Sequence, residues 1–169
     1  MRRSSRAPAL LVLLACCKGG ATTDQSPRLL DGIVAFPPRD TVRFSVPATT
    51  HRCTEARTVV LEALGPEGNG VLVRLHYRDS LAPVSYPVIM PGDTTAPGAA
   101  VAVRYQLREV GHSFAADSGT VEVHRSGDEL AGRMQLTGIE NGIRTPTRIE
   151  FHDVPLPAPA DTMSCAFQP

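Results

Sequence analysis

Residues 101–107, VAVRYQL, place a large apolar side chain at every second position, with Arg104 and Gln106 between them. Successive side chains of an extended strand point to opposite faces, so the apolar residues here would share one face and Arg104 would lie on the other. This period-two pattern is typical of a strand with one face buried and one face in water. It predicts a strand over 101–110, and the same alternation at 71–77, VLVRLHY, predicts a second one.

Other segments of the chain show related patterns. Residues 58–64 are apolar on both faces except for Glu62, as in a central strand, and Gly68-Asn69-Gly70 would turn the chain into 71–77 to form a hairpin. A second hairpin is predicted over 119–138, with its turn at Ser126-Gly127-Asp128. Further strands are expected at 41–46 and around Ile149–Phe151.

No convincing helical pattern follows the first thirty residues. About seven or eight short strands separated by turn signals predict an all-β fold, a single antiparallel β-sandwich or partly open β-barrel. Residues 78–98 carry four prolines and are predicted as a long loop with at most a short edge strand at Val88–Met90. Long loops without structure are often functional, so this loop is a candidate contact surface.

The first fifteen residues have the three parts of an export signal. Arg2, Arg3 and Arg6 form a positive end, and 9–15 form a short apolar core. At about 1.5 Å of helix rise per residue, this core is far shorter than the roughly 30 Å hydrocarbon layer of a membrane. The sequence therefore predicts a cleaved signal peptide over residues 1–15.

Leu13-Leu14-Ala15-Cys16 resembles the lipobox of bacterial lipoproteins, which has a branched apolar residue three positions before the cysteine and a small one directly before it. The resemblance covers only the signal and Cys16. It implies that Cys16 becomes the N-terminus and carries acyl chains such as palmitate. Two or three chains anchor a protein stably where one gives marginal binding. An ordinary cleaved signal is the alternative.

The resemblance also implies a location at the cell envelope, periplasmic or surface-facing. In the sorting rule of some Gram-negative bacteria, an aspartate after the lipidated cysteine retains the protein at the inner membrane. Cys17 stands in that place here, which favours the outer membrane. Residues 16–27 are small and polar and are expected to form a flexible tether, with 28–169 as one β domain.

The net charge and the aromatic content of the chain restrict the classes of molecule that it would bind. Of the 17 basic and 17 acidic residues, three arginines leave with the signal, so the remaining chain carries 14 against 17, a net charge of about −3. A slightly acidic chain argues against a nucleic-acid partner, which would need a basic face. The absence of Trp disfavours a sugar-stacking surface.

Cys53 and Cys165 remain after the signal region. An exported protein meets an oxidising compartment, so we expect a disulfide between them. The bridge would tie the C-terminal tail to the start of the first core strand. The alternative, in which one or both cysteines bind a metal, has only His51 as a nearby supporting ligand.

Asp117-Ser118-Gly119 resembles the active-site tripeptide of aspartic proteases, in which a second Asp shares one proton with the first. The family also has an apolar pair before a later Gly, and Leu130-Ala131-Gly132 comes too soon after the tripeptide for that fold. With one tripeptide, a homodimer would be required. The sequence favours a turn that opens a hairpin, with Asp and Gly in their usual turn roles.

Two Glu-x-His pairs, Glu122/His124 and Glu150/His152, are weak candidates for a metal site. Residues two apart share a strand face, so neighbouring strands would bring four ligands suited to Zn²⁺ together. The alternative is that both pairs lie on a solvated face, and no metal or other cofactor is predicted. Four arginines on predicted strands are likewise interpreted as a solvated face: Arg74, Arg104, Arg108 and Arg133.

The sequence contains no nucleophile motif or phosphate loop, and we predict no catalytic residue and no enzyme activity. The expected function is a lipid-anchored envelope protein that binds another envelope protein or organises the cell surface. The alternative is a module that binds a small ligand or a metal.

Overall fold

The computed structural model describes residues 29–55 and 57–165, and these residues form strands and no helix. The predicted signal peptide, the tether and Cys16 lie outside the described residues. The strands are β1 (Leu29–Phe36), β2 (Asp40–Cys53), β3 (Thr58–Leu64), β4 (Gly70–His76), β5 (Val84–Pro87), β6 (Gly98–Leu107), β7 (Val110–Ser126), β8 (Glu129–Glu140), β9 (Ile143–Pro155) and β10 (Thr162–Met163).

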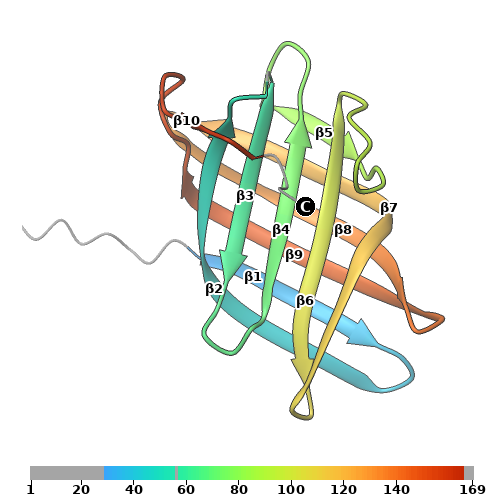
Figure 1. The fold of residues 1–169 in the computed structure, drawn as a ribbon. Coiled ribbons are helices and arrows are strands. Elements are labelled where there is room, and N and C mark those ends of the chain that lie inside the picture. The colour runs from blue at the N-terminus through green and yellow to red at the C-terminus, as the bar shows by residue number, and fades with distance from the viewer. Residues whose placement is uncertain (1–28, 56, 166–169) are drawn as a thin grey trace, which may run out of the picture.

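Eight of these strands form a closed barrel in which each strand is antiparallel to its neighbours (Figure 1). The order around the barrel is β1, β2, β3, β4, β6, β7, β8 and β9, and β9 pairs back onto β1. The prediction of an all-β, antiparallel fold with seven or eight strands is confirmed. Of the two predicted architectures the chain adopts the barrel, and closure leaves it without the open edge of a partly open sheet.

The two short strands lie where neighbouring barrel strands diverge. β7 pairs with β6 as far as Ala115, and from Thr120 it pairs with β5 instead. β5 therefore lies beside β7 where the last residues of β7 have separated from the first residues of β6. The first part of β2, from Asp40 to Pro47, pairs with β1. Its last two residues, Arg52 and Cys53, pair with β10 instead. These two additions extend the hydrogen bonding where the barrel strands separate.

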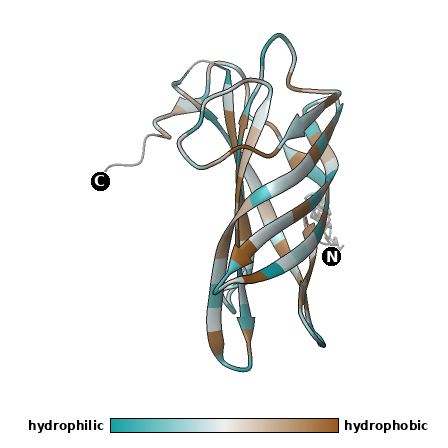
Figure 2. Ribbon diagram, turned by 90° about the vertical axis from the view of Figure 1, so that its right-hand side faces the viewer, coloured by the Kyte–Doolittle hydropathy of each residue, from teal (hydrophilic) through white to brown (hydrophobic). Residues whose placement is uncertain are grey.

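The alternation of side-chain direction along each strand determines which residues point into the barrel. Except for the partly buried Leu107, the apolar residues of β3, β4 and β6 that point inward are at most 4% exposed, whereas their neighbours in sequence lie on the outer face. Apolar and polar bands alternate along the ribbons in Figure 2. An eight-stranded barrel is just wide enough for side chains to fill it, and here the buried side chains include Tyr86, Tyr105 and Met134.

Three glycines on the inner face make room for phenylalanine rings. A Cβ on Gly32 would lie 2.2 Å from Phe44 Cζ on the partner strand, and one on Gly138 would lie 2.1 Å from Phe114 Cδ2. A Cβ on Gly132 would similarly meet the ring of Phe151. Each ring therefore lies directly against a glycine of a nearby strand, which leaves room for three large side chains inside a narrow barrel.

One polar cluster lies among the inward side chains at the end of the barrel that holds the β8–β9 turn. The Tyr105 hydroxyl donates to Glu140 Oε2 at 2.6 Å, and His112 Nδ1 lies 2.7 Å from Glu140 Oε1. The rings of Tyr105 and His112 stack with centroids 5.1 Å apart. Both oxygens of the buried carboxylate thus have partners, as burial of a polar group requires.

Three local predictions are wrong. The strand predicted over 101–110 ends at Leu107, because Arg108 and Glu109 both adopt positive φ and form the β6–β7 turn. The tripeptide 117–119 is not a turn: it lies inside β7, where the register with β8 shifts, and Gly119 has φ +126°. The edge strand comes earlier than Val88–Met90, at Val84–Pro87.

Candidate functional site

A groove of about 600 Å³ lies on the outer face of the barrel, within the roughly 300–1,000 Å³ typical of small-molecule sites. Its floor comes from the outward side chains of β3, β4 and β6. Its sides come from the C-terminal segment that follows β9 and from the loop between β5 and β6. The lining consists of His51, Val60, Glu62, Leu72, Arg74, His76, Pro91, Gly92, Asp93, Thr94, Ala100, Val101, Ala102, Met163, Ser164 and Cys165.

The strand register places the floor residues in adjacent rows. The rows read Val60, Arg74 and Ala100, and then Glu62, Leu72 and Ala102. Ala100 and Ala102 are short, so β6 forms the deep part of the floor. Val60 and Leu72 are only partly buried although they are apolar, which leaves apolar surface facing the groove.

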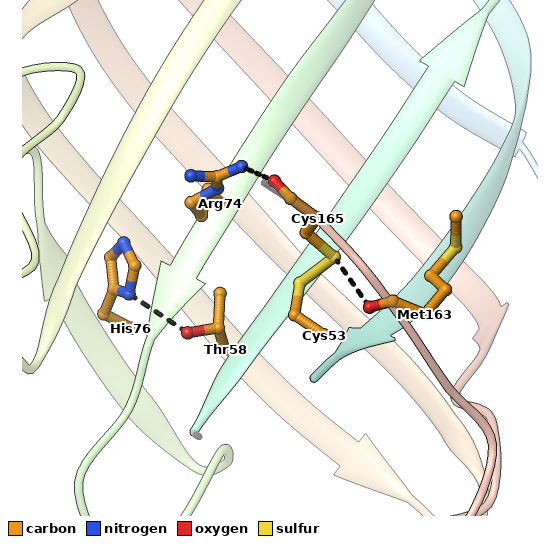
Figure 3. The surroundings of a disulfide bond; sticks show 6 residues. All are labelled: Cys53, Thr58, Arg74, His76, Met163 and Cys165. Carbon is orange, nitrogen blue, oxygen red and sulfur yellow. Dashed lines mark hydrogen bonds between the residues drawn. A yellow bond between two sulfur atoms is a disulfide. The ribbon is translucent and has the colours of Figure 1, made fainter. Parts of the chain in front are cut away.

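The C-terminal segment forms one wall and is fixed by a covalent bond. Cys53 at the end of β2 is bonded to Cys165, 112 residues later in the chain, so the predicted disulfide is present (Figure 3). Arg74 donates to the carbonyl oxygen of Cys165, and the Thr54 amide donates to the Met163 carbonyl at 2.9 Å. The wall is therefore held by main-chain and side-chain contacts as well as by the disulfide.

The loop before β6 forms the other wall. The Asp93 carboxylate accepts hydrogen bonds from the Thr95 amide at 2.8 Å and from the Thr95 hydroxyl at 2.7 Å. These bonds fix the chain from Asp93 to Thr95 and lower the pKa of the Asp93 carboxyl, while the Asp93 amide donates to the Met90 carbonyl at 3.0 Å and closes the turn that contains Pro91 and Gly92. The long loop that the sequence marked as a contact surface thus contributes one side of the groove.

His76 lies at one end of the floor, next to Arg74. It is 8% exposed, and its Nδ1 lies 3.3 Å from the Thr58 hydroxyl. Figure 3 marks this contact with a dashed line. Burial lowers the pKa of His76, and the Arg74 charge lowers it further, while the Asp93 carboxylate opposes both. The neutral imidazole is thus favoured, with Nδ1 beside the Thr58 hydroxyl and Nε2 as the second ring nitrogen that can form a hydrogen bond.

A second hollow of about 310 Å³ continues the groove past His76. It shares Arg74, His76 and Thr94 with the groove. Its lining adds Glu55, Arg57, Thr58, Tyr77, Arg78 and Ala96. Three arginines against one glutamate give this end a net positive charge, whereas the floor of the main groove is mostly apolar.

The structure does not bring the two Glu-x-His pairs together. Glu122 and His124 lie on β7, and Glu150 and His152 lie on β9, with β8 between them. Arg133 of β8 stands in register between the two glutamates, and its Nε donates to Glu122 at 2.8 Å. This ion pair lowers the pKa of Glu122, so the carboxylate has a cation partner from the protein itself.

The remaining candidates also have partners. Asp117 accepts from the Ser118 hydroxyl at 2.8 Å and lies 3.4 Å from an Arg144 nitrogen. Arg108 pairs with Asp40 at 3.0 Å across the barrel end. Of the four arginines predicted on a solvated face, only Arg74 lines the groove. Sequence reasoning placed Arg74 on a solvated face but missed the site, because the outward side chains of several strands and two separate loops form it together.

Comparison with known proteins gives no relative for this chain: no family model, curated protein or solved structure matches it. In residues 29–55 and 57–165 no helix is long and apolar enough to cross a membrane.

Proposed function

We propose that this chain is a non-catalytic, lipid-anchored protein of the cell envelope whose outer groove binds a single acyl chain with a carboxylate head, as in a fatty acid. The observation that carries the proposal is the joining of an apolar groove to an arginine-lined hollow. An acyl chain would lie along Val60, Leu72 and the two alanines of β6. The carboxylate would lie beside the arginines.

Charge complementarity supports an anionic head. Arg57, Arg74 and Arg78 line the second hollow with one carboxylate, Glu55, and planar guanidinium groups bind carboxylates in two-point contacts. The neutral imidazole of His76 lies at the junction and supplies a further polar contact. A cationic or uncharged head would gain none of the arginine contacts.

The apolar floor supports an acyl chain. Each CH₂ group transferred from water to an apolar surface contributes about 0.8 kcal/mol, which is roughly a fourfold gain in affinity. The anchor predicted at Cys16 would place this groove near a membrane, where such amphiphiles occur. The anchor itself rests on the resemblance of residues 13–16 to a lipobox.

Titration calorimetry with the full-length chain carrying Cys16→Ala tests the proposal. Decanoate should bind at one site, decanol about tenfold or more weakly, and dodecanoate more tightly than decanoate. Ala102→Leu should fill the floor and weaken decanoate binding at least tenfold. Ala115→Leu is the matched control, because Ala115 pairs with Ala102 in register but does not line the groove.

Charge is tested separately. Arg57→Gln with Arg78→Gln should remove the preference for decanoate over decanol, and Arg148→Gln on β9 should leave it unchanged. Equal affinity for decanoate and decanol in the wild-type chain would overturn the proposal. A second result would also overturn it: neither amphiphile binds, and crosslinking in intact cells recovers a partner protein with the wild type but not with Ala102→Leu. That result would assign the groove to a protein partner.

A further inference from the structure

Three metal-ligating groups converge beside the groove. The sulfur atoms of Cys53 and Cys165 and a carboxylate oxygen of Glu55 all lie within 4.8 Å of one another. No other set of three His, Cys, Asp or Glu side chains comes this close in the part of the chain that the structure describes. Cys53 is buried, Cys165 is partly buried and Glu55 is exposed, so the cluster opens to solvent on one side.

Contacts other than the disulfide hold these groups in place. Cys53 ends β2, and Glu55 follows it by two residues. The segment that carries Cys165 is fixed by the pairing of β10 with β2 and by the hydrogen bond from the Thr54 amide to Met163. Arg74 holds the Cys165 carbonyl (Figure 3). Breaking the sulfur–sulfur bond leaves all of these contacts available, so both thiols would stay near Glu55.

We propose that reduction of the Cys53–Cys165 disulfide creates a zinc site formed by Cys53, Cys165 and Glu55. Thiolates and carboxylates are preferred zinc ligands, at about 2.3 Å for sulfur and roughly 2.0–2.2 Å for oxygen. Three protein ligands leave the fourth tetrahedral position to water or to His51. His51 lies two residues before Cys53 on β2 and therefore on the same strand face.

The chemistry balances with a dithiol as reductant. The dithiol gives two electrons and two protons to the disulfide, which becomes two thiols, and the dithiol becomes a disulfide. Zn²⁺ then displaces the two thiol protons, and two zinc–sulfur bonds form. Oxidised and zinc-bound forms exclude each other, because the same sulfur atoms serve in both.

The test uses the full-length Cys16→Ala chain, and the probe is Zn²⁺ alone. After reduction by a phosphine, which competes for zinc less than a dithiol does, the protein should bind one Zn²⁺, and the oxidised protein should bind none at the same site. Substitution by Co²⁺ should give the near-ultraviolet absorption of cobalt–thiolate bonds, a signature that adventitious surface sites lack. Calorimetry and the cobalt spectrum report independently of fatty-acid binding, so failure here leaves the groove proposal standing.

Two variants make the result decisive. The double variant Cys53→Ser with Cys165→Ser lacks the covalent link, and so does the reduced wild type. A difference in zinc affinity between these two proteins therefore reports on the sulfur ligands alone. Glu55→Gln changes one exposed side chain and should weaken zinc binding at least about tenfold, since even partners outside the ligand set contribute about 10–100-fold. Glu129→Gln should leave it unchanged. Equal zinc affinity of the reduced wild type and the double serine variant, or no effect of Glu55→Gln, overturns the proposal.

Discussion

The Tyr105 hydroxyl donates a 2.6 Å hydrogen bond to the Glu140 carboxylate inside the barrel, and the two residues come from β6 and β8, on either side of β7. His112 of β7 binds the other carboxylate oxygen at 2.7 Å, so the three side chains link three successive strands. Burial and the bond to Glu140 raise the pKa of Tyr105, which keeps its hydroxyl a donor across the accessible pH range.

Removing the centre of this cluster should destabilise the barrel. Glu140→Gln replaces an acceptor of two charge-assisted hydrogen bonds by an amide, and we expect a loss of about 1–3 kcal/mol in the free energy of unfolding. Urea unfolding followed by circular dichroism measures it. Glu129→Gln, at an exposed site in the same strand, is the control. Equal stability of the two variants would show that the cluster contributes nothing.

His76 should make stability depend on pH. Its pKa is lowered in the folded state, mainly by burial, so the unfolded chain binds more protons in the interval below its ordinary value of 6.5. Stability should therefore be full above about pH 6.5 and fall as the pH drops towards the lowered value. The urea midpoint between pH 8 and pH 5 should shift less in His76→Gln than in the wild type. His124→Gln, on exposed β7 surface, should keep the wild-type shift.

The disulfide should contribute strongly to stability. It closes a loop with a sequence separation of 112, for which the chain-entropy model gives roughly 4–5 kcal/mol. Reduction should lower the melting temperature of the wild type and leave Cys53→Ser with Cys165→Ser unchanged. Mass spectrometry after alkylation, with and without reduction, counts the free thiols. Two free thiols before reduction would show that the bond does not form in solution.

Gly32→Ala should be costly although it adds one methyl group. The new Cβ would lie 2.2 Å from Phe44 Cζ, so the ring or the strand must move, and overpacking of this kind destabilises by about 1–3 kcal/mol. Adding Phe44→Leu should recover part of the loss, which a double-mutant cycle measures. Gly111→Ala is the control, because its Cβ would make an ordinary contact 3.4 Å from Gln106 Nε2.

The lipid anchor is tested by fractionation. If Cys16 is acylated, the wild type should sediment with membranes and Cys16→Ala should not, because the acyl chains supply most of the membrane affinity. Metabolic labelling with an alkyne fatty acid should mark the wild type but not Cys16→Ala. Labelling of Cys17→Ala at wild-type level would assign the acylated residue to Cys16.

Period-two alternation was sufficient to predict most of the barrel strands and their inward faces. Val71, Val73 and Leu75 are buried as their spacing indicates, and both predicted hairpins form antiparallel pairs. The β6–β7 turn was missed because Arg108 and Glu109 adopt positive φ without a glycine to signal it. The turn interpretation of 117–119 failed because a β-bulge uses the same residue types as a turn.

The groove could not be predicted from the sequence, for a different reason. Val60, Leu72 and Ala102 each appear as an outward residue of a separate strand, and nothing local shows that they are neighbours. Their proximity follows from the register of three strands. The wall adds Cys165, which is 112 residues from Cys53 in the sequence and is held beside it by the disulfide and by the pairing of β10 with β2. The disulfide was predictable from two cysteines and the predicted export signal, but its place beside a groove was not.

The two short strands β5 and β10 have a consequence for how copies of the molecule meet. Where β7 leaves β6, and where β2 leaves β1, main-chain amides would otherwise line up unpaired, and such rows recruit strands from other chains. β5 pairs with β7 at the first place, and β10 pairs with the end of β2 at the second. At these two places in the described structure the main-chain groups of β7 and β2 are therefore already paired within the chain, and a neighbouring copy meets only the short outer edges of a four-residue and a two-residue strand.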